Sequence, residues 1–295
     1  GDVTLSGTAG ATTGTVTGSG TTYNVAVSGM TGSGTVIASI AADVAVDGSS
    51  NGNQASTSTD NTVTYDATPP AVTIEQAVGQ VDPTATSPIN FTVVFNEPVT
   101  GFTIGDVVLT GTAGATTVIL TGSGTTYNVA VSGMTGSGTV VANIPAAAAV
   151  DASGNPNLAS TSVDNTVTYD VTPPTVTINQ AVGQADPTGT SPINFTVVFN
   201  EPVTGFATGD VVLSGTAGAT TGTVTGSGTT YNVAVSGMTG SGTVIATVPA
   251  AVAVDIDAND NLASTSTDNT VTFNSCVLTC PANITVSNTA GQCGA

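Results

Sequence analysis

One stretch of this chain recurs three times at a fixed spacing of 104 residues, and the only three methionines mark it (134 − 30 = 104; 238 − 134 = 104). These methionines are Met30, Met134 and Met238. Residues 6–38 and 214–246 have the same sequence throughout, and the middle copy, 110–142, differs at a few positions. A chain that repeats a whole domain nearly unchanged is typical of proteins that use their domains for length or copy number.

Each repeat has the pattern of an all-β domain. Apolar and polar residues alternate in short segments, as in strands with one buried face, and Gly-Ser-Gly segments supply turns. Seven such strands in about 100 residues predict tandem Ig-like β-sandwiches. Within one repeat the predicted strands centre on Val72 and Ile74; Phe91, Val93 and Phe95; Val107 and Leu109; residues 116–121; Tyr127, Val129 and Val131; Val140, Ala142 and Ile144; and Val167 and Tyr169.

Paired prolines mark the boundaries between repeats. Residues 65–70 and 169–174 share the pattern Tyr-Asp-x-Thr-Pro-Pro, and two prolines cannot donate to a sheet ladder, so we expect short, stiff linkers that join domains end to end. The predicted domains are a partial repeat, two complete repeats and the start of a further domain: 1–68, 69–172, 173–275 and 276–295. The first copy lacks its first two strands, so we expect a segment of a longer assembly or a subunit that a neighbour completes.

The charge balance excludes several functions. The chain has 19 acidic residues and no Lys, Arg or His. Nucleic acids and anionic membranes require cationic side chains, so neither is an expected partner. Histidine triads, lysine Schiff bases and P-loops are also excluded, and no run of about 20 apolar residues predicts membrane insertion. Glu97 and Glu201 occur once per repeat and do not supply a catalytic carboxylate pair, so we expect them to hold a turn or bulge and predict no enzyme.

Calcium is the one cofactor that the residues suggest. Ca²⁺ binds six to eight oxygens from carboxylates, amides and carbonyls. Two acidic loops in the full repeats offer such oxygens, and an Asp beside each Pro-Pro pair lies where an ion would lock two domains together. The candidate ligands are Asp66, Asp151, Asn155, Asn157, Asp170, Asp255, Asp257 and Asp260. The alternative is that these Asp and Asn residues form turns through their own side chains.

Cysteines occur only near the end of the chain, at positions 276, 280 and 293. The repeats therefore depend on core packing alone. An odd number of cysteines in an exported protein predicts one disulfide and one cysteine paired elsewhere. Cys280 and Cys293 are the candidate pair, because residues 283–286 between them look like one strand and its turn.

The repeat sequence resembles a known family. Residues 172–206 read TPPTVTINQAVGQADPTGTSPINFTVVFNEPVTGF, and GDVVLSGTAG continues at 209–218. They are similar to the bacterial Ig-like repeats of large cell-surface and secreted proteins, a resemblance that covers about residues 1–275. The tail CPANITVSNTAGQCGA, within 276–295, resembles the opening of a hyalin-repeat (HYR) domain. Both resemblances imply export, tandem arrays and a role as a stalk, adhesin or matrix fibre.

We therefore expect a structural extracellular protein, a rigid array that forms the stalk or fibre of a bacterial surface adhesin or matrix filament. Its partners would be neighbouring repeats of the same or identical chains. A first alternative is a self-assembling filament subunit, in which strand addition from another molecule completes residues 1–68. A second is a module that binds a glycan or a protein, whose mark would be an exposed aromatic cluster; a cell-surface ligand outside this segment is also compatible with the leading expectation.

Overall fold

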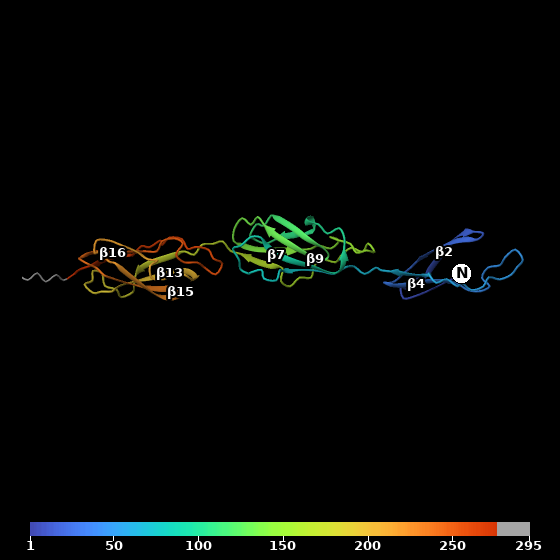
Figure 1. The fold of residues 1–295 in the computed structure, drawn as a ribbon, viewed down its shortest axis with the longest axis horizontal. Helices are drawn as coiled ribbons and strands as arrows, with labels where there is room; N and C mark the ends of the chain where they lie inside the picture. The colour runs from blue at the N-terminus through green and yellow to red at the C-terminus, as the bar shows by residue number, and fades with distance from the viewer. Residues whose placement is uncertain (276–295) are drawn as a thin grey trace, which may run out of the picture. The chain divides into compact units, whose positions relative to one another are not determined.

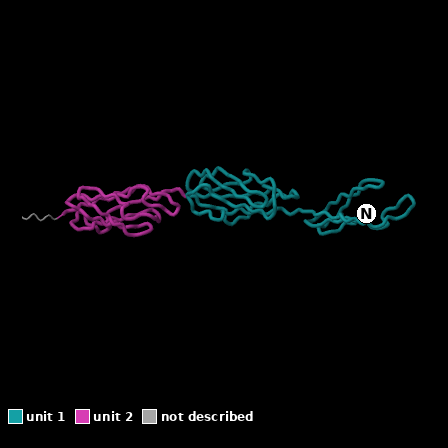
Figure 2. The backbone as a smooth tube through the Cα atoms, viewed as in Figure 1, with its two compact units in different colours: residues 1–169 teal, residues 170–295 magenta. Residues whose placement is uncertain are grey.

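The computed structural model describes residues 1–275 and is all-β, as the sequence predicts (Figure 1). The predicted Cys280–Cys293 disulfide and HYR-like tail lie outside the described residues. Two compact units, residues 1–169 and 170–295, are distinguished in Figure 2. Over residues 1–275 no helix has the length and apolar character needed to cross a membrane.

The second repeat is a two-layered sandwich of antiparallel sheets. Its strands are β6 (Val72–Gln76), β7 (Ile89–Val99), β8 (Val108–Thr110), β9 (Thr117–Ser132), β10 (Gly138–Asn143) and β11 (Thr166–Tyr169). One sheet has the order β6-β7-β9 and the other the order β11-β10-β8. Buried residues of both sheets form one hydrophobic cluster, so the core lies between the two layers.

Strand β9 contains two of the predicted strands and folds back on itself. The Thr116 amide donates to the Ser132 oxygen at 3.1 Å, which pairs the two ends of the hairpin. At the turn, Gly122 has φ +108, and a Cβ there would lie 2.4 Å from the main-chain oxygen of Thr126. Only glycine accommodates both the backbone angle and this close approach, so the Gly-Ser-Gly segment is a requirement of the hairpin.

The buried face of β7 carries the largest side chains of the core. Its residues alternate between buried and accessible, and Val93 of β7 pairs with Tyr127 of β9. The Phe95, Phe102 and Tyr127 rings meet edge to face, with centroids 5.4, 6.0 and 5.1 Å apart. Edge-to-face contacts add stability beyond the burial of apolar area, which compensates for the low aromatic content of the chain.

The third repeat has the same architecture. Its strands are β12 (Val176–Gln180), β13 (Ile193–Val203), β14 (Val212–Ser214), β15 (Thr221–Ser236), β16 (Gly242–Thr247) and β17 (Thr270–Phe273). The pairing register is that of the second repeat moved by 104 residues, and Val197 pairs with Tyr231 as Val93 does with Tyr127. A second hydrophobic cluster fills this sandwich.

Residues 1–68 form an incomplete version of the repeat. Their strands are β1 (Val3–Ser6), β2 (Thr13–Ser19), β3 (Thr22–Ser28), β4 (Gly34–Ile40) and β5 (Thr62–Tyr65). β1, β4 and β5 form one sheet, and β2 pairs with β3 in a two-stranded hairpin. Nothing in these residues corresponds to β6 and β7, and Ala9 and Val36 are their only buried apolar residues.

Candidate metal site at the start of a full repeat

Three carboxylates converge at the N-terminal end of the second repeat. One oxygen each of Asp66, Glu97 and Asp151 lies within 4.8 Å of the other two. Asp66 follows β5, Glu97 lies on β7, and Asp151 follows the bridge residue Val150. The residues are far apart in sequence, so the sandwich fold brings them together.

Asp66 is oriented by the linker that it precedes. Its Oδ1 accepts hydrogen bonds from the amide of Thr68 at 2.9 Å and from the hydroxyl of Ser33 at 3.0 Å. The bond from Thr68, followed by that from Ser33, holds the pKa of Asp66 below its usual range, although the charge of Asp151 acts in the opposite direction. Asp66 is therefore an ionised ligand candidate.

Asp151 closes its own loop. Its Oδ1 accepts from the amides of Ser153 and Asn155, both at 2.8 Å, and its Oδ2 accepts from the Asn155 side chain at 2.9 Å. Burial opposes ionisation of this buried carboxyl group, but the hydrogen bonds from Asn155 and Ser153 together outweigh it and lower the pKa of Asp151. The turn-forming role considered for these residues is present in the structure. It still leaves Oδ2, which accepts one hydrogen bond, with a lone pair for a cation.

Asn155 connects this loop to the linker. Its side-chain nitrogen also donates to the main-chain oxygen of Asp66, 3.2 Å away. In contrast, the Asn157 amide serves its own loop: its oxygen accepts from Ala149 at 2.7 Å, and its nitrogen donates to Pro145 and Leu158. Asn155 therefore positions the carboxylates, whereas Asn157 shapes the loop that holds them.

Sequence reasoning did not place Glu97 among the candidate ligands. The β-bulge expected at Glu97 is present in the structure. It is seen as a shift in the register of β7 against β9 between Val94 and Val99. Next to Glu97, the side-chain oxygen of Asn96 accepts a hydrogen bond from the amide of Ala71 at 2.8 Å, which stabilises the bulge. Glu97 itself lies with Asp66 and Asp151. The only sequence signal was an acidic residue that recurs 104 positions later, as Glu201.

The third repeat has Asp170, Glu201 and Asp255 at the corresponding positions. Among the described residues, only the group of the second repeat brings its three carboxylate oxygens within 4.8 Å of one another. Burial, and then the charges of Asp255, Asp170 and Asp257, raise the pKa of Glu201 above its usual range, whereas a bond from Asn200 acts against them. The Asn259 side chain donates to Asp255 Oδ2 at 2.9 Å and to the Asp170 main-chain oxygen at 3.2 Å. The four carboxylates therefore interact electrostatically at this position.

The remaining candidates lie on the same loop of the third repeat. The amide of Asp257 donates to Asp255 Oδ1 at 2.8 Å, and Asp257 stands where the second repeat has Ser153. Asp260 forms a backbone bridge with Val254 and replaces Pro156. Asp257 therefore lies close enough to Glu201 to raise its pKa. Asp260 contributes to the loop through its backbone bridge with Val254.

Each group of carboxylates offers a cation several negatively charged oxygens and no positive charge. Hard divalent cations bind such oxygen sets, so the acidic group Asp66, Glu97 and Asp151 can hold a metal ion. Comparison with protein-family models and with curated proteins finds no match to this chain. The chemistry of the site therefore rests on its geometry alone.

Proposed function

We propose that this chain is a structural extracellular protein whose repeats form a stalk or fibre, as in a bacterial surface adhesin or matrix filament. The observation that carries the proposal is that residues 69–169 and 170–273 use the same strands, register and core at a spacing of 104 residues. Selection for a particular reaction would favour one specialised site, whereas repetition of an entire domain favours length.

The proposed mechanism is mechanical. Each full repeat has its own hydrophobic core, so it can fold as a separate unit. The connection that enters the second repeat is short, and its Pro70 oxygen accepts from the Leu158 amide at 2.9 Å. The corresponding Pro174 accepts from Leu262 at the same distance. Anchoring the second proline to the following sandwich limits the freedom of each connection, so length would increase with the number of repeats.

The length of variants tests this role. Inserting one additional copy of residues 69–172 should raise the maximum dimension in small-angle X-ray scattering, and a second copy should raise it by the same increment. Exchanging the Pro69-Pro70 pair for a Gly-Ser tether of ten residues is the matched control, and should broaden the distance distribution. Insertions that leave the maximum dimension unchanged would contradict a role in length.

We further propose that Ca²⁺ is the cation of the carboxylate groups. The ion would be held by Asp66, Glu97 and Asp151 in one repeat and by Asp170, Glu201 and Asp255 in the next, with water and main-chain oxygens completing its shell. Calcium suits the proposal because it is abundant outside cells and tolerates irregular oxygen geometry. It would neutralise carboxylates that have no basic residue to pair with and would tie each linker Asp to the repeat that follows.

Calorimetric titration of the metal-free chain tests this assignment. We expect binding of two Ca²⁺ ions per chain, one of which is lost in the Glu97→Gln variant. The exposed Asp60 is the matched control, since Asp60→Asn removes one charge from the same chain and should leave both sites intact. Loss of affinity in both variants would indicate non-specific screening of the acidic surface rather than a site.

A further inference from the structure

The second repeat has a hollow of about 350 Å³ at the side of its sandwich, which we call the edge groove. It is formed by β8, the last strand of one sheet, and by the first half of the β9 hairpin in the other. Its lining residues include Ile104, Val107, Leu109, Ala115 and Val118. The third repeat has a hollow of about 410 Å³ at the corresponding positions, so the groove is a feature of the fold.

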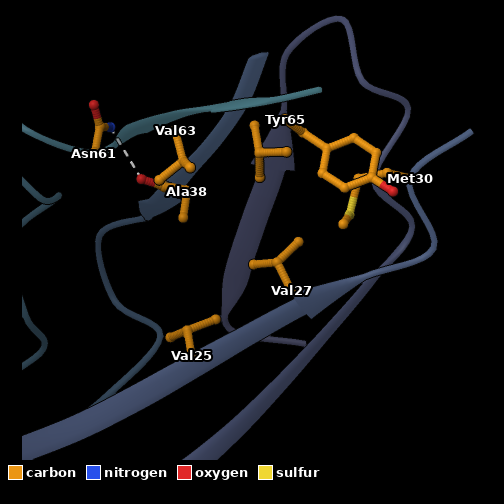
Figure 3. A pocket seen from close by; sticks show the side chains of 8 residues that line it. Val25, Val27, Met30, Ala38, Asn61, Val63 and Tyr65 are labelled. Carbon is orange, nitrogen blue, oxygen red and sulfur yellow. Dashed lines mark hydrogen bonds between the residues drawn. The ribbon is translucent and has the colours of Figure 1, made fainter. Parts of the chain in front are cut away.

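Figure 3 shows a different hollow, on residues 1–68, which Val25 and Val27 line together with other residues. The second repeat has Val129 and Val131 at these two positions, and both are completely buried. The hollow in Figure 3 therefore consists of core positions. The edge groove, in contrast, stays open in a repeat whose core is complete.

The second and third repeats differ most along the edge groove. Residues 110–142 have the same sequence as residues 214–246 except at positions 110, 118, 119, 120 and 141. Three of these positions are consecutive in the first half of β9, where the second repeat reads Val-Ile-Leu and the third reads Gly-Thr-Val. The second repeat therefore carries the larger apolar side chains on this strand.

Two differences change the lining of the groove itself. Ile104 stands where the third repeat has Thr208, and Val118 stands where it has Gly222. The exposed fraction of Ile104 is 59%. Removing such a side chain from water is favourable, so the groove of the second repeat is suited to apolar contact with a partner.

The backbone at the groove offers a hydrogen bond as well. In the third repeat the amide of Val224 donates to the hydroxyl of Thr208 at 3.1 Å, so this amide points out of the hairpin. The corresponding residue of the second repeat is Leu120, and the side chain of Ile104 has no oxygen to accept the same bond. A strand edge with an outward amide beside an apolar groove is a template for an added strand.

Charge decides what kind of segment fits the groove. Asp106 lies in sequence between the lining residues Gly105 and Val107, and the third repeat has Asp210 at the same place. The chain has 19 acidic residues and no Lys, Arg or His, so a second copy would bring only further negative charge. A strand that carries Lys or Arg complements Asp106 instead.

We propose that the edge groove of the second repeat binds an extended segment of a basic partner protein, which adds as a strand to residues 117–121 of β9. Apolar side chains at alternate positions of the segment contact Leu109 and Val118, and a carbonyl oxygen of the segment accepts from the amide of Leu120. Lys or Arg beside them pairs with Asp106. The inference rests on the groove and not on the proposed roles in length or calcium binding, so it can fail separately.

A synthetic peptide tests the proposal on the full 295-residue chain. The probe has about nine residues, with Val and Thr alternating and Lys at both ends. Fluorescence anisotropy should show saturable binding of one peptide per chain. Two control peptides, one with its valines in a single block and one with Glu in place of Lys, should bind at least about tenfold more weakly. Absence of binding, or equal binding of either control, would overturn the proposal.

Exchanging residues between repeats locates the site, because each new residue already occurs in a folded repeat. Ile104→Thr combined with Val118→Gly gives the second repeat the lining of the third, and should weaken binding more than about tenfold. Ile119→Thr is the matched control on the opposite face of the same strand, and should change binding less than about threefold. Unchanged binding in the double variant would refute the assignment, as would dimerisation of the chain through this groove.

The reverse exchange should create a second site. Thr208→Ile combined with Gly222→Val gives the third repeat the lining of the second, and we expect two peptides per chain. The larger side chain has room, because a Cβ at Gly222 would lie 3.6 Å from Leu213 and 3.5 Å from Val233, which is ordinary van der Waals contact. A stoichiometry that stays at one would contradict the role given to these two positions.

Amide hydrogen exchange measured by NMR reports the added strand directly. Saturating peptide should slow the exchange of the Leu120 amide, since a carbonyl oxygen of the peptide then accepts from it. The Val224 amide is the internal control, because Thr208 already accepts from it and its exchange should stay the same. Unchanged exchange at Leu120 in the peptide complex would overturn strand addition.

Discussion

The side-chain amide of Asn155 donates a hydrogen bond to the main-chain oxygen of Asp66, 3.2 Å away, although 89 residues separate the two in sequence. The same side chain also donates to Asp151. Asn259 repeats both bonds with Asp170 and Asp255. One asparagine in each full repeat thus joins the acidic loop to the residue that precedes the Pro-Pro linker.

Asn155→Ala should therefore destabilise the second repeat by about 1–2 kcal/mol, since it removes two hydrogen bonds from a half-buried position. Asn51→Ala is the matched control. Asn51 donates to Asp47 Oδ2 at 3.0 Å in the same way, but the described residues give it no linker oxygen to bind. Urea denaturation should show the larger loss for Asn155→Ala, and equal losses would mean that the bond to Asp66 contributes nothing.

The effect of Glu201→Gln on thermal stability should reverse when calcium is added. The pKa of Glu201 is raised above its ordinary value of 4.5, so the ionised group opposes folding once the pH exceeds its folded pKa. Without metal, the variant should melt at a higher temperature than the parent at pH 7, and the difference should vanish near pH 4. With calcium present at ten to a hundred times a millimolar-range Kd, the parent gains roughly 1.4–2.7 kcal/mol at this site and the variant does not.

The acidic groups at the other site predict the opposite pH trend. The pKa values of Asp66 and Asp151 are lowered from the ordinary 3.8. Their contribution to stability is therefore present above that pH and is lost as the pH falls through their folded values. Asp151→Asn should flatten the acid limb of the stability curve measured by thermal melts in the absence of metal. An unchanged acid limb would contradict this assignment.

Tyr127→Ala should cost about 3–5 kcal/mol, because it empties a buried aromatic position that Phe95 and Phe102 contact. Tyr23→Ala changes the same position of the first copy, where the ring is exposed, and should cost less than about 1 kcal/mol. Chemical denaturation of the two variants compares them directly. Similar losses would show that residues 1–68 are covered in solution.

Gly111→Ala should be strongly destabilising. Gly111 has φ +106, and a Cβ there would lie 2.2 Å from the main-chain oxygen of Thr139, so backbone must move. We expect a loss above about 2 kcal/mol. Gly136→Ala is the control, because nothing lies within 4 Å of its added Cβ and its φ is not in the left-handed region. A loss at Gly136 as large as that at Gly111 would contradict the explanation.

The strands could be predicted from the sequence because their causes are local. Apolar residues at alternate positions, such as Phe91, Val93 and Phe95, predict a strand with one buried face. The glycine at position 122 predicts a nearby turn, and neither prediction depends on distant residues. The metal ligands could be predicted only in part. Asp66 and Asp151 were recognised by their loops and linker, whereas Glu97 joins them through a β-bulge and the pairing of distant strands, neither of which leaves a local signal.

The sequence by itself determined the 104-residue period, the succession of strands along the chain and the all-β class, since these follow from residue patterns within each repeat. Only the tertiary structure decided which positions are buried. Tyr23 and Tyr231 lie within identical 33-residue segments (38 − 6 + 1 = 33), yet one ring is exposed and the other is buried. The reason is physical: burial depends on β12 and β13, which cover the third repeat and have no counterpart in residues 1–68.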